Sequence, residues 1–113
     1  MSYNYILLSE SDGVATVTFN RPDALNALTP DLLSETRDAL DLLSKRPDIG
    51  VVVLTGAGRA FSAGVDLKAL NELGLDLGEG NVGDDLNNKA REVQSLLENM
   101  PQATIAKVNG FCF

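Results

Sequence analysis

The chain opens on an alternation of apolar and polar positions that predicts a β-hairpin. Residues 5–8 and 14–19 are two short runs of β-forming residues, and Asp12-Gly13 lies between them. An Asp-Gly pair favours the tight turn that joins two antiparallel strands. In the second run the side chains alternate along the backbone, so we expect one face of that strand to be buried.

The spacing of apolar residues then changes to that of a helix. Thr29-Pro30-Asp31 is a typical helix start, because Thr caps free N–H groups, Pro suits the first position and Asp favours the positive end of the dipole. One apolar stripe follows, made of Leu32, Leu33, Thr36, Leu40 and Leu43. Pro47 and Gly50 predict the end of this element.

The second half repeats the alternation of strand and helix. The continuous apolar run at 51–54 predicts a strand covered on both faces, and the order strand, helix, strand predicts a right-handed crossover. A second helix is expected from Asp84 or Asp85 to Asn99, then a strand at 104–108 and a turn at 109–110. We expect no closing strand at residues 111–113. The predicted class is α/β: a short hairpin, then alternating helices and parallel strands.

Residues 71–88 differ from the rest in composition. They are rich in glycine and acidic residues, and no basic residue offsets the acids between 71 and 88. A solvated loop is the simple interpretation, and a lid over a ligand is the alternative.

Charge and composition exclude several classes of function. The formal net charge is −7, which argues against nucleic-acid binding because phosphate contacts need clustered Lys and Arg. Cys112 is the single cysteine and cannot form an internal disulfide. No apolar run approaches the ~20 residues of a membrane span, and the first 15 residues lack signal-peptide features. We therefore expect a cytoplasmic protein that contacts neither nucleic acid nor membrane.

Residues 56–68 are the strongest candidate for chemistry. Glycines and small residues leave the backbone of this segment almost bare after a strand, and Asp66-Leu67-Lys68 resembles a first helical turn. Free N–H groups in such a place suit an anion or a developing oxyanion. A dinucleotide fingerprint is the alternative, but its third glycine is missing because position 61 is Phe. The chain has no His, so a Cys-His nucleophile pair cannot form within it.

Four segments in order resemble the crotonase family, the enoyl-CoA hydratases and isomerases. They are 20–28 (NRPDALNAL), 51–56 (VVVLTG), 58–67 (GRAFSAGVDL) and 105–110 (IAKVNG). The resemblance implies the N-terminal portion of a spiral of ββα units, so residues 1–113 would be an incomplete crotonase-like domain. An end at residue 113 also reads as a cut rather than a natural terminus. The parent of such a piece is expected to be a homotrimer or hexamer.

The resemblance also implies a mechanism. Family members bind acyl-CoA thioesters and hold the thioester oxygen of an enolate-like intermediate with two backbone N–H groups. The first donor falls on Val65, while the second donor and the acid/base glutamates fall beyond Phe113. Coenzyme A enters as part of the substrate, and neither another cofactor nor a metal is implied. A chain that lacks the second donor is expected to be inactive alone.

The residues that line the CoA cleft in the family carry over to Arg21, Ala24, Leu25, Ala63, Gly64, Val65, Asp66, Leu67 and Lys68. Simpler roles compete with these assignments. Asp66 more readily stabilises a helix start, Lys68 suits a solvated surface, and Arg21 suits pairing with a nearby acid. Asn26 is expected to satisfy backbone groups of its loop rather than to touch substrate.

Other functions remain open on the same residues. Thioester hydrolysis, decarboxylation and dehalogenation are crotonase chemistries that share the first donor. A non-catalytic interaction module on the same fold is the alternative from a different class.

Overall fold

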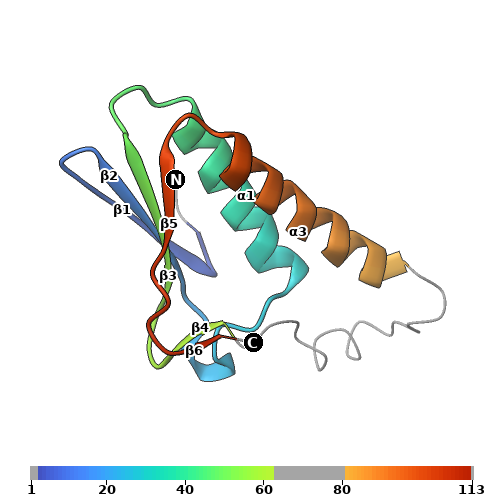
Figure 1. The fold of residues 1–113 in the computed structure, drawn as a ribbon. Helices are drawn as coiled ribbons and strands as arrows, with labels where there is room; N and C mark the ends of the chain where they lie inside the picture. The colour runs from blue at the N-terminus through green and yellow to red at the C-terminus, as the bar shows by residue number, and fades with distance from the viewer. Residues whose placement is uncertain (1–2, 63–80, 113) are drawn as a thin grey trace.

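The computed structural model describes residues 3–62 and 81–112, which form a four-stranded sheet with its helices on one face (Figure 1). The sheet order is β1-β2-β3-β5, with β1 antiparallel to β2 and the other neighbours parallel. A second, two-stranded parallel sheet pairs β4 with β6 at one end. The strands are β1 (Ile6–Ser11), β2 (Val14–Phe19), β3 (Val51–Gly56), β4 (Ala60–Ser62), β5 (Ala103–Ala106) and β6 (Phe111–Cys112); the helices are η1 (Pro22–Ala24), α1 (Pro30–Ser44) and α3 (Asn81–Asn99).

The predicted hairpin is confirmed. Asp12 and Gly13 have positive φ angles of 51° and 80°, the backbone that a tight hairpin turn between right-twisted strands requires. The first strand runs to Ser11, further than the predicted 5–8, because all six residues of β1 pair with β2 up to the turn.

Helix α1 begins where the sequence predicts. The Thr29 hydroxyl accepts a hydrogen bond from the Leu32 N–H at 3.2 Å, and Pro30 occupies the first turn. The predicted stripe of α1 is buried and joins β2, β3 and residues of α3 in one apolar core, with Leu32 and Leu40 fully enclosed. Helix α3 packs along α1 on the side away from the sheet (Figure 1).

Two expectations about these elements are wrong. Helix α3 begins at Asn81 rather than at Asp84 or Asp85, so residues 81–88 are helical and do not belong to a loop. Strand β3 is not covered on both faces: Val52 and Leu54 are buried, whereas Val51 and Val53 are partly exposed. The helices lie on a single face of the sheet, so among the described residues no helix covers the other (Figure 1).

The expectation that no closing strand follows residue 110 is also wrong. Residues 111–112 form β6, which pairs in parallel with β4, with Ala60 opposite Phe111 and Ser62 opposite Cys112. Strands of two or three residues are too short to show a period in sequence, and their partner is about fifty residues away. In the parts of the chain that the structure describes, no helix combines the length and apolarity needed to cross a membrane.

Candidate functional site

The candidate site lies where the parallel strands end and the chain turns into β4. Strand β3 finishes at Gly56, residues 57–59 turn, and β4 starts at Ala60 beside η1 and β6 (Figure 1). Carboxyl ends of parallel strands are the usual place for ligand sites in α/β sheets. Parts of all four segments that resemble crotonases converge here through the hydrogen bonds of Asn26 and Asn109.

Asn26 joins segment 20–28 to the turn after β3 and to β4. It is fully buried and has a positive φ of 55°. Its Nδ2 donates to the carbonyl oxygens of Ala57 at 2.9 Å and Ala60 at 2.8 Å, and its Oδ1 accepts from the Arg21 N–H at 2.8 Å. Its own carbonyl accepts from the Ser62 hydroxyl at 2.9 Å. The prediction that Asn26 satisfies backbone groups is confirmed, and these groups extend beyond its own loop.

Asn109 holds the same turn through the other side of the site. Its Oδ1 accepts from the Gly56 N–H at 3.2 Å, and its Nδ2 donates to the Gly58 carbonyl at 3.0 Å. The Thr55 hydroxyl lies 3.3 Å from the same Oδ1 and is closer, at 2.9 Å, to the Lys107 carbonyl. The sequence pattern marked Asn109-Gly110 only as a turn and missed this role. No local sequence pattern indicates that Asn109 holds the turn, since its partners lie more than fifty residues earlier.

The glycines of the turn are structural. A Cβ on Gly56 would collide with the carbonyl oxygens of Ala60 and Phe61, and a Cβ on Gly110 with the carbonyl of Arg59. Gly58 has a φ of 81°, which other residues rarely adopt. The backbone of the turn therefore packs closely enough that side chains are excluded from it, which fits the structural interpretation of Gly56 and Gly58.

The structure describes three of the predicted substrate-binding residues. The Arg21 Nη1 donates to the Ala27 carbonyl at 2.7 Å, so the guanidinium helps to hold its own loop. Ala24 ends η1, Leu25 follows with a φ of 52°, and both are partly exposed beside the turn. Ala63, Gly64, Val65, Asp66, Leu67 and Lys68 lie outside the described residues. Ser62, tied to Asn26, is the last described residue before them.

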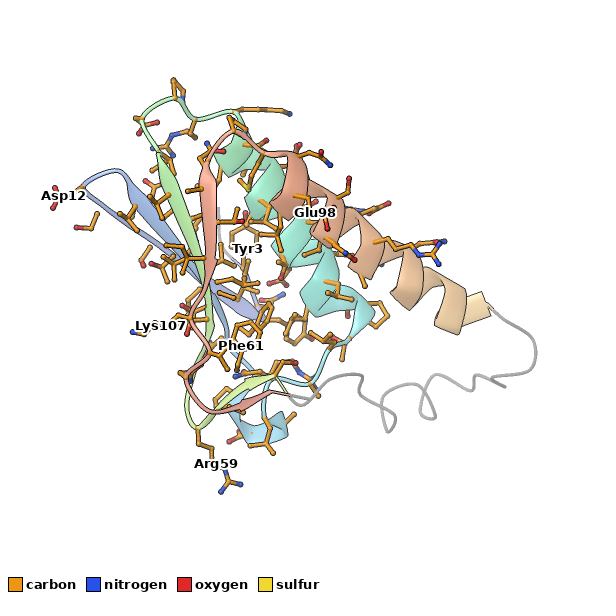
Figure 2. The ribbon with its side chains drawn as sticks, in the orientation of Figure 1. Tyr3, Asp12, Arg59, Phe61, Glu98 and Lys107 are labelled. Carbon is orange, nitrogen blue, oxygen red and sulfur yellow. The ribbon has the colours of Figure 1, made fainter. Side chains whose placement is uncertain are left out.

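Side chains around the turn differ in their exposure (Figure 2). Phe61 is partly buried and lies 5.5 Å from Phe19 between ring centroids, on the helix side of the sheet. Arg59 projects from the tip of the turn into solvent. One face of the turn is thus anchored in the apolar core, while its tip carries a cation.

Displaced pKa values belong to other parts of the molecule. Burial, aided by the carboxylates of Asp38 and Glu35, raises the pKa of the Tyr3 hydroxyl. A hydrogen bond from Arg46 lowers the pKa of Asp48. The Arg46 guanidinium binds Asp48 and Glu10 rather than the turn. The described residues hold no group of three His, Cys, Asp or Glu side chains suited to a metal.

The comparisons with known proteins agree on one family. The sequence model of enoyl-CoA hydratase/isomerase matches residues 9–113. A hydroxycinnamoyl-CoA hydratase-lyase of Pseudomonas fluorescens is 43% identical over 90% of this chain and 37% of its own length. A short-chain-enoyl-CoA hydratase of Clostridium acetobutylicum is 38% identical over 98% of this chain and 41% of its own length.

The fold agrees as well. A crystal structure of an enoyl-CoA hydratase from Bacillus anthracis superposes with a TM-score of 0.84 at 30% identity, covering 95% of this chain and 40% of that one. The chain thus spans about two-fifths of the length of these three relatives. Its elements are those of the N-terminal part of their fold, and the chain belongs to the enoyl-CoA hydratase/isomerase family.

Proposed function

We propose that this chain supplies the acyl-CoA cleft and the first oxyanion donor of an enoyl-CoA hydratase or isomerase. The donor is the backbone N–H of Val65, which would hold the thioester oxygen as it gains negative charge. Ala24 and Leu25 on one side, and residues 63–68 on the other, would line the cleft for coenzyme A, with Arg21 holding the loop between them. Family membership supports the substrate class.

The parallel pairing of β4 with β6 is the observation that carries the proposal. Parallel strands deliver the residues that follow them to the same end of a sheet. Val65 lies three positions after the end of β4, and the family's second donor lies in the turn that follows β6. Two N–H groups that follow neighbouring parallel strands can both point at one oxygen. An enolate oxygen requires this arrangement of donors.

The amide is also the right kind of group for this reaction. Adding water across the double bond of an enoyl thioester moves negative charge onto the thioester oxygen. A preorganised N–H in a dry site stabilises that charge, and removing one such donor typically costs 10²–10³-fold in kcat. The acid/base groups would come from residues beyond position 113.

Replacing Val65 tests the donor directly. Val65→Pro removes the N–H and should lower kcat for crotonyl-CoA hydration by about a hundredfold or more in the whole protein. Val65→Ala keeps the N–H and serves as the matched control, with a kcat expected within about fivefold of the unchanged protein. Circular dichroism establishes that both variants fold. Equal kcat values for the Pro and Ala variants would remove Val65 from the oxyanion hole.

The 113-residue chain by itself tests the need for the second donor. We expect no crotonyl-CoA hydration above background from the purified chain. A single oxyanion donor without an acid/base pair leaves the activation free energy of hydration almost unchanged. Hydration is followed by the loss of enoyl thioester absorbance. Turnover close to that of a complete hydratase would contradict the proposed division of the site.

A second candidate comes from the Pseudomonas relative. Its name describes a hydratase-lyase acting on hydroxycinnamoyl-CoA, and it is 43% identical over 103 residues. The same oxyanion donor would serve an aromatic enoyl thioester. Comparing kcat/KM for crotonyl-CoA and a hydroxycinnamoyl-CoA separates the two. A lyase step would break the Cα–Cβ bond of the hydrated aromatic thioester and release an aromatic aldehyde together with acetyl-CoA.

A further inference from the structure

Four backbone groups of the turn after β3 are held by two asparagine side chains. Asn26 binds the carbonyls of Ala57 and Ala60, and Asn109 binds the N–H of Gly56 and the carbonyl of Gly58. We call these two side chains the asparagine clamp. They lie 83 residues apart in the sequence, and along the turn their backbone partners alternate between Asn109 and Asn26.

The two members of the asparagine clamp are not equivalent. Asn26 is fully buried, whereas Asn109 is exposed. Water can replace the hydrogen bonds of an exposed amide, but a buried carbonyl that loses its donor pays the full cost of desolvation. The course of the turn therefore depends most on Asn26.

The turn also lies close in sequence to the proposed donor. Ser62, which ends β4, donates to the Asn26 carbonyl, and Val65 follows three residues later. The Asn26 side chain also accepts a hydrogen bond from the Arg21 N–H. A single residue therefore links the loop that carries Ala24 and Leu25 to the strand that leads to residue 63, and these are the two sides of the proposed cleft.

We infer that Asn26 is a positioning residue, which orients the segment leading to the oxyanion donor without touching the substrate. This inference rests on the proposed function. It predicts that Asn26 affects kcat beyond its effect on stability. A donor amide shifted by about 1 Å can cost up to about a hundredfold in rate, while binding of the distant parts of coenzyme A changes little.

Gln102 provides a matched control at the opposite end of the sheet. It is also buried, and its Nε2 donates to two backbone carbonyls, Leu43 at 2.6 Å and Arg46 at 3.1 Å. Asn26→Asp and Gln102→Glu thus make the same change: each sets a carboxylate oxygen against two carbonyl oxygens. Both variants should unfold at a lower temperature than the unchanged protein, because each buries an unsatisfied acceptor.

The experiment measures kcat, KM and the unfolding temperature of both variants in the whole protein with crotonyl-CoA. We expect Asn26→Asp to lower kcat between tenfold and about a hundredfold with KM changed less than threefold, and Gln102→Glu to leave kcat within twofold. Equal losses of kcat in the two variants would show that Asn26 acts on stability alone and would overturn the inference. If the carboxylate variants do not fold, Asn26→Ala and Gln102→Ala make the same comparison without a buried charge.

A pH profile measured for both carboxylate variants adds a second readout, because lost stability alone would change the kcat of Asn26→Asp and of Gln102→Glu with pH in the same way. A buried carboxyl has a raised pKa, and once protonated it can again donate to one of the two carbonyls. The ratio of the Asn26→Asp kcat to the unchanged kcat should therefore rise as the pH falls. A ratio independent of pH, together with equal kcat losses in the two variants, would contradict the role of the donor.

Hydrogen exchange separates this inference from the proposed function. Amides of residues 57–62 should exchange faster in Asn26→Asp than in Gln102→Glu, whichever reaction the protein catalyses. If the unchanged protein turns over no enoyl-CoA but this difference is seen, the proposed function fails while Asn26 still fixes the turn. If exchange at 57–62 is the same in both variants, the inference itself fails.

Discussion

Gly56 and Gly50 lie at opposite ends of β3 and differ in what surrounds their Cα atoms. An added Cβ at Gly56 meets two backbone carbonyl oxygens and the Asn26 amide, whereas at Gly50 nothing described lies within 4 Å. Backbone atoms cannot move aside as a flexible side chain can. Gly56 is thus required by the close approach of β3 to β4, while Gly50 is free to vary.

Alanine at these two glycines should have unequal effects on stability. Gly56→Ala should lower the free energy of unfolding by about 1–3 kcal/mol, since the turn must shift to admit the methyl group. Gly50→Ala should change it by less than about 1 kcal/mol, because the open space around Gly50 admits the methyl group without a shift of the backbone. Urea titration followed by circular dichroism measures both. A Gly56→Ala variant as stable as Gly50→Ala would show that the turn is looser than its contacts indicate.

Single residues were predictable where their partners are local. Thr29 caps the helix that starts one residue later, and Asp12-Gly13 makes the hairpin, because each acts on atoms within three residues. Asn26 was predicted to bind backbone groups, but the identity of Ala57 and Ala60 as its partners could not be read from the sequence. Asn109 was missed altogether for the same reason, since its role exists only once β3 and β5 are adjacent.

Among the elements, length decided what the sequence could predict. β2, α1 and most of α3 extend over enough residues to show their period, and each was placed within a few residues of its observed bounds. β4 and β6 have three and two residues and show no period, although their pairing shapes the candidate site. The part of the fold nearest to function was therefore the part least visible in the pattern.

The faces of β3 show a second limit of sequence patterns. Its run of valines predicts cover on both sides, which the described residues provide on one side only. The apolar side chains of a strand match what covers its two faces in the whole protein, whereas the structure shows only the cover that the described residues provide. Since the chain spans about two-fifths of its relatives, we propose that further residues cover the second face in the whole protein.

At the scale of the whole molecule, the described residues place helices on one face of the sheet and none on the other. Leu7 on β1 and Ile105 on β5 are each 52% exposed. Ile105 pairs with the partly exposed Val53, and β5 is an edge of the described sheet. An edge strand with exposed apolar residues is a template for association with other chains. The isolated 113-residue chain should therefore self-associate as its concentration rises.

Placing a charge on this face should reduce that association. Ile105→Lys puts an ammonium group on the edge strand, where pairing with another chain would bury it, so the fraction of oligomer in analytical ultracentrifugation should fall several-fold. Gln94→Lys makes the same change of charge on the exposed side of α3, where the Gln94 side chain donates to Glu98, and should leave association unchanged. If both variants reduce association equally, net charge rather than the bare face governs it. If neither does, the chain associates through another surface, and the exposure of Ile105 has no consequence for assembly.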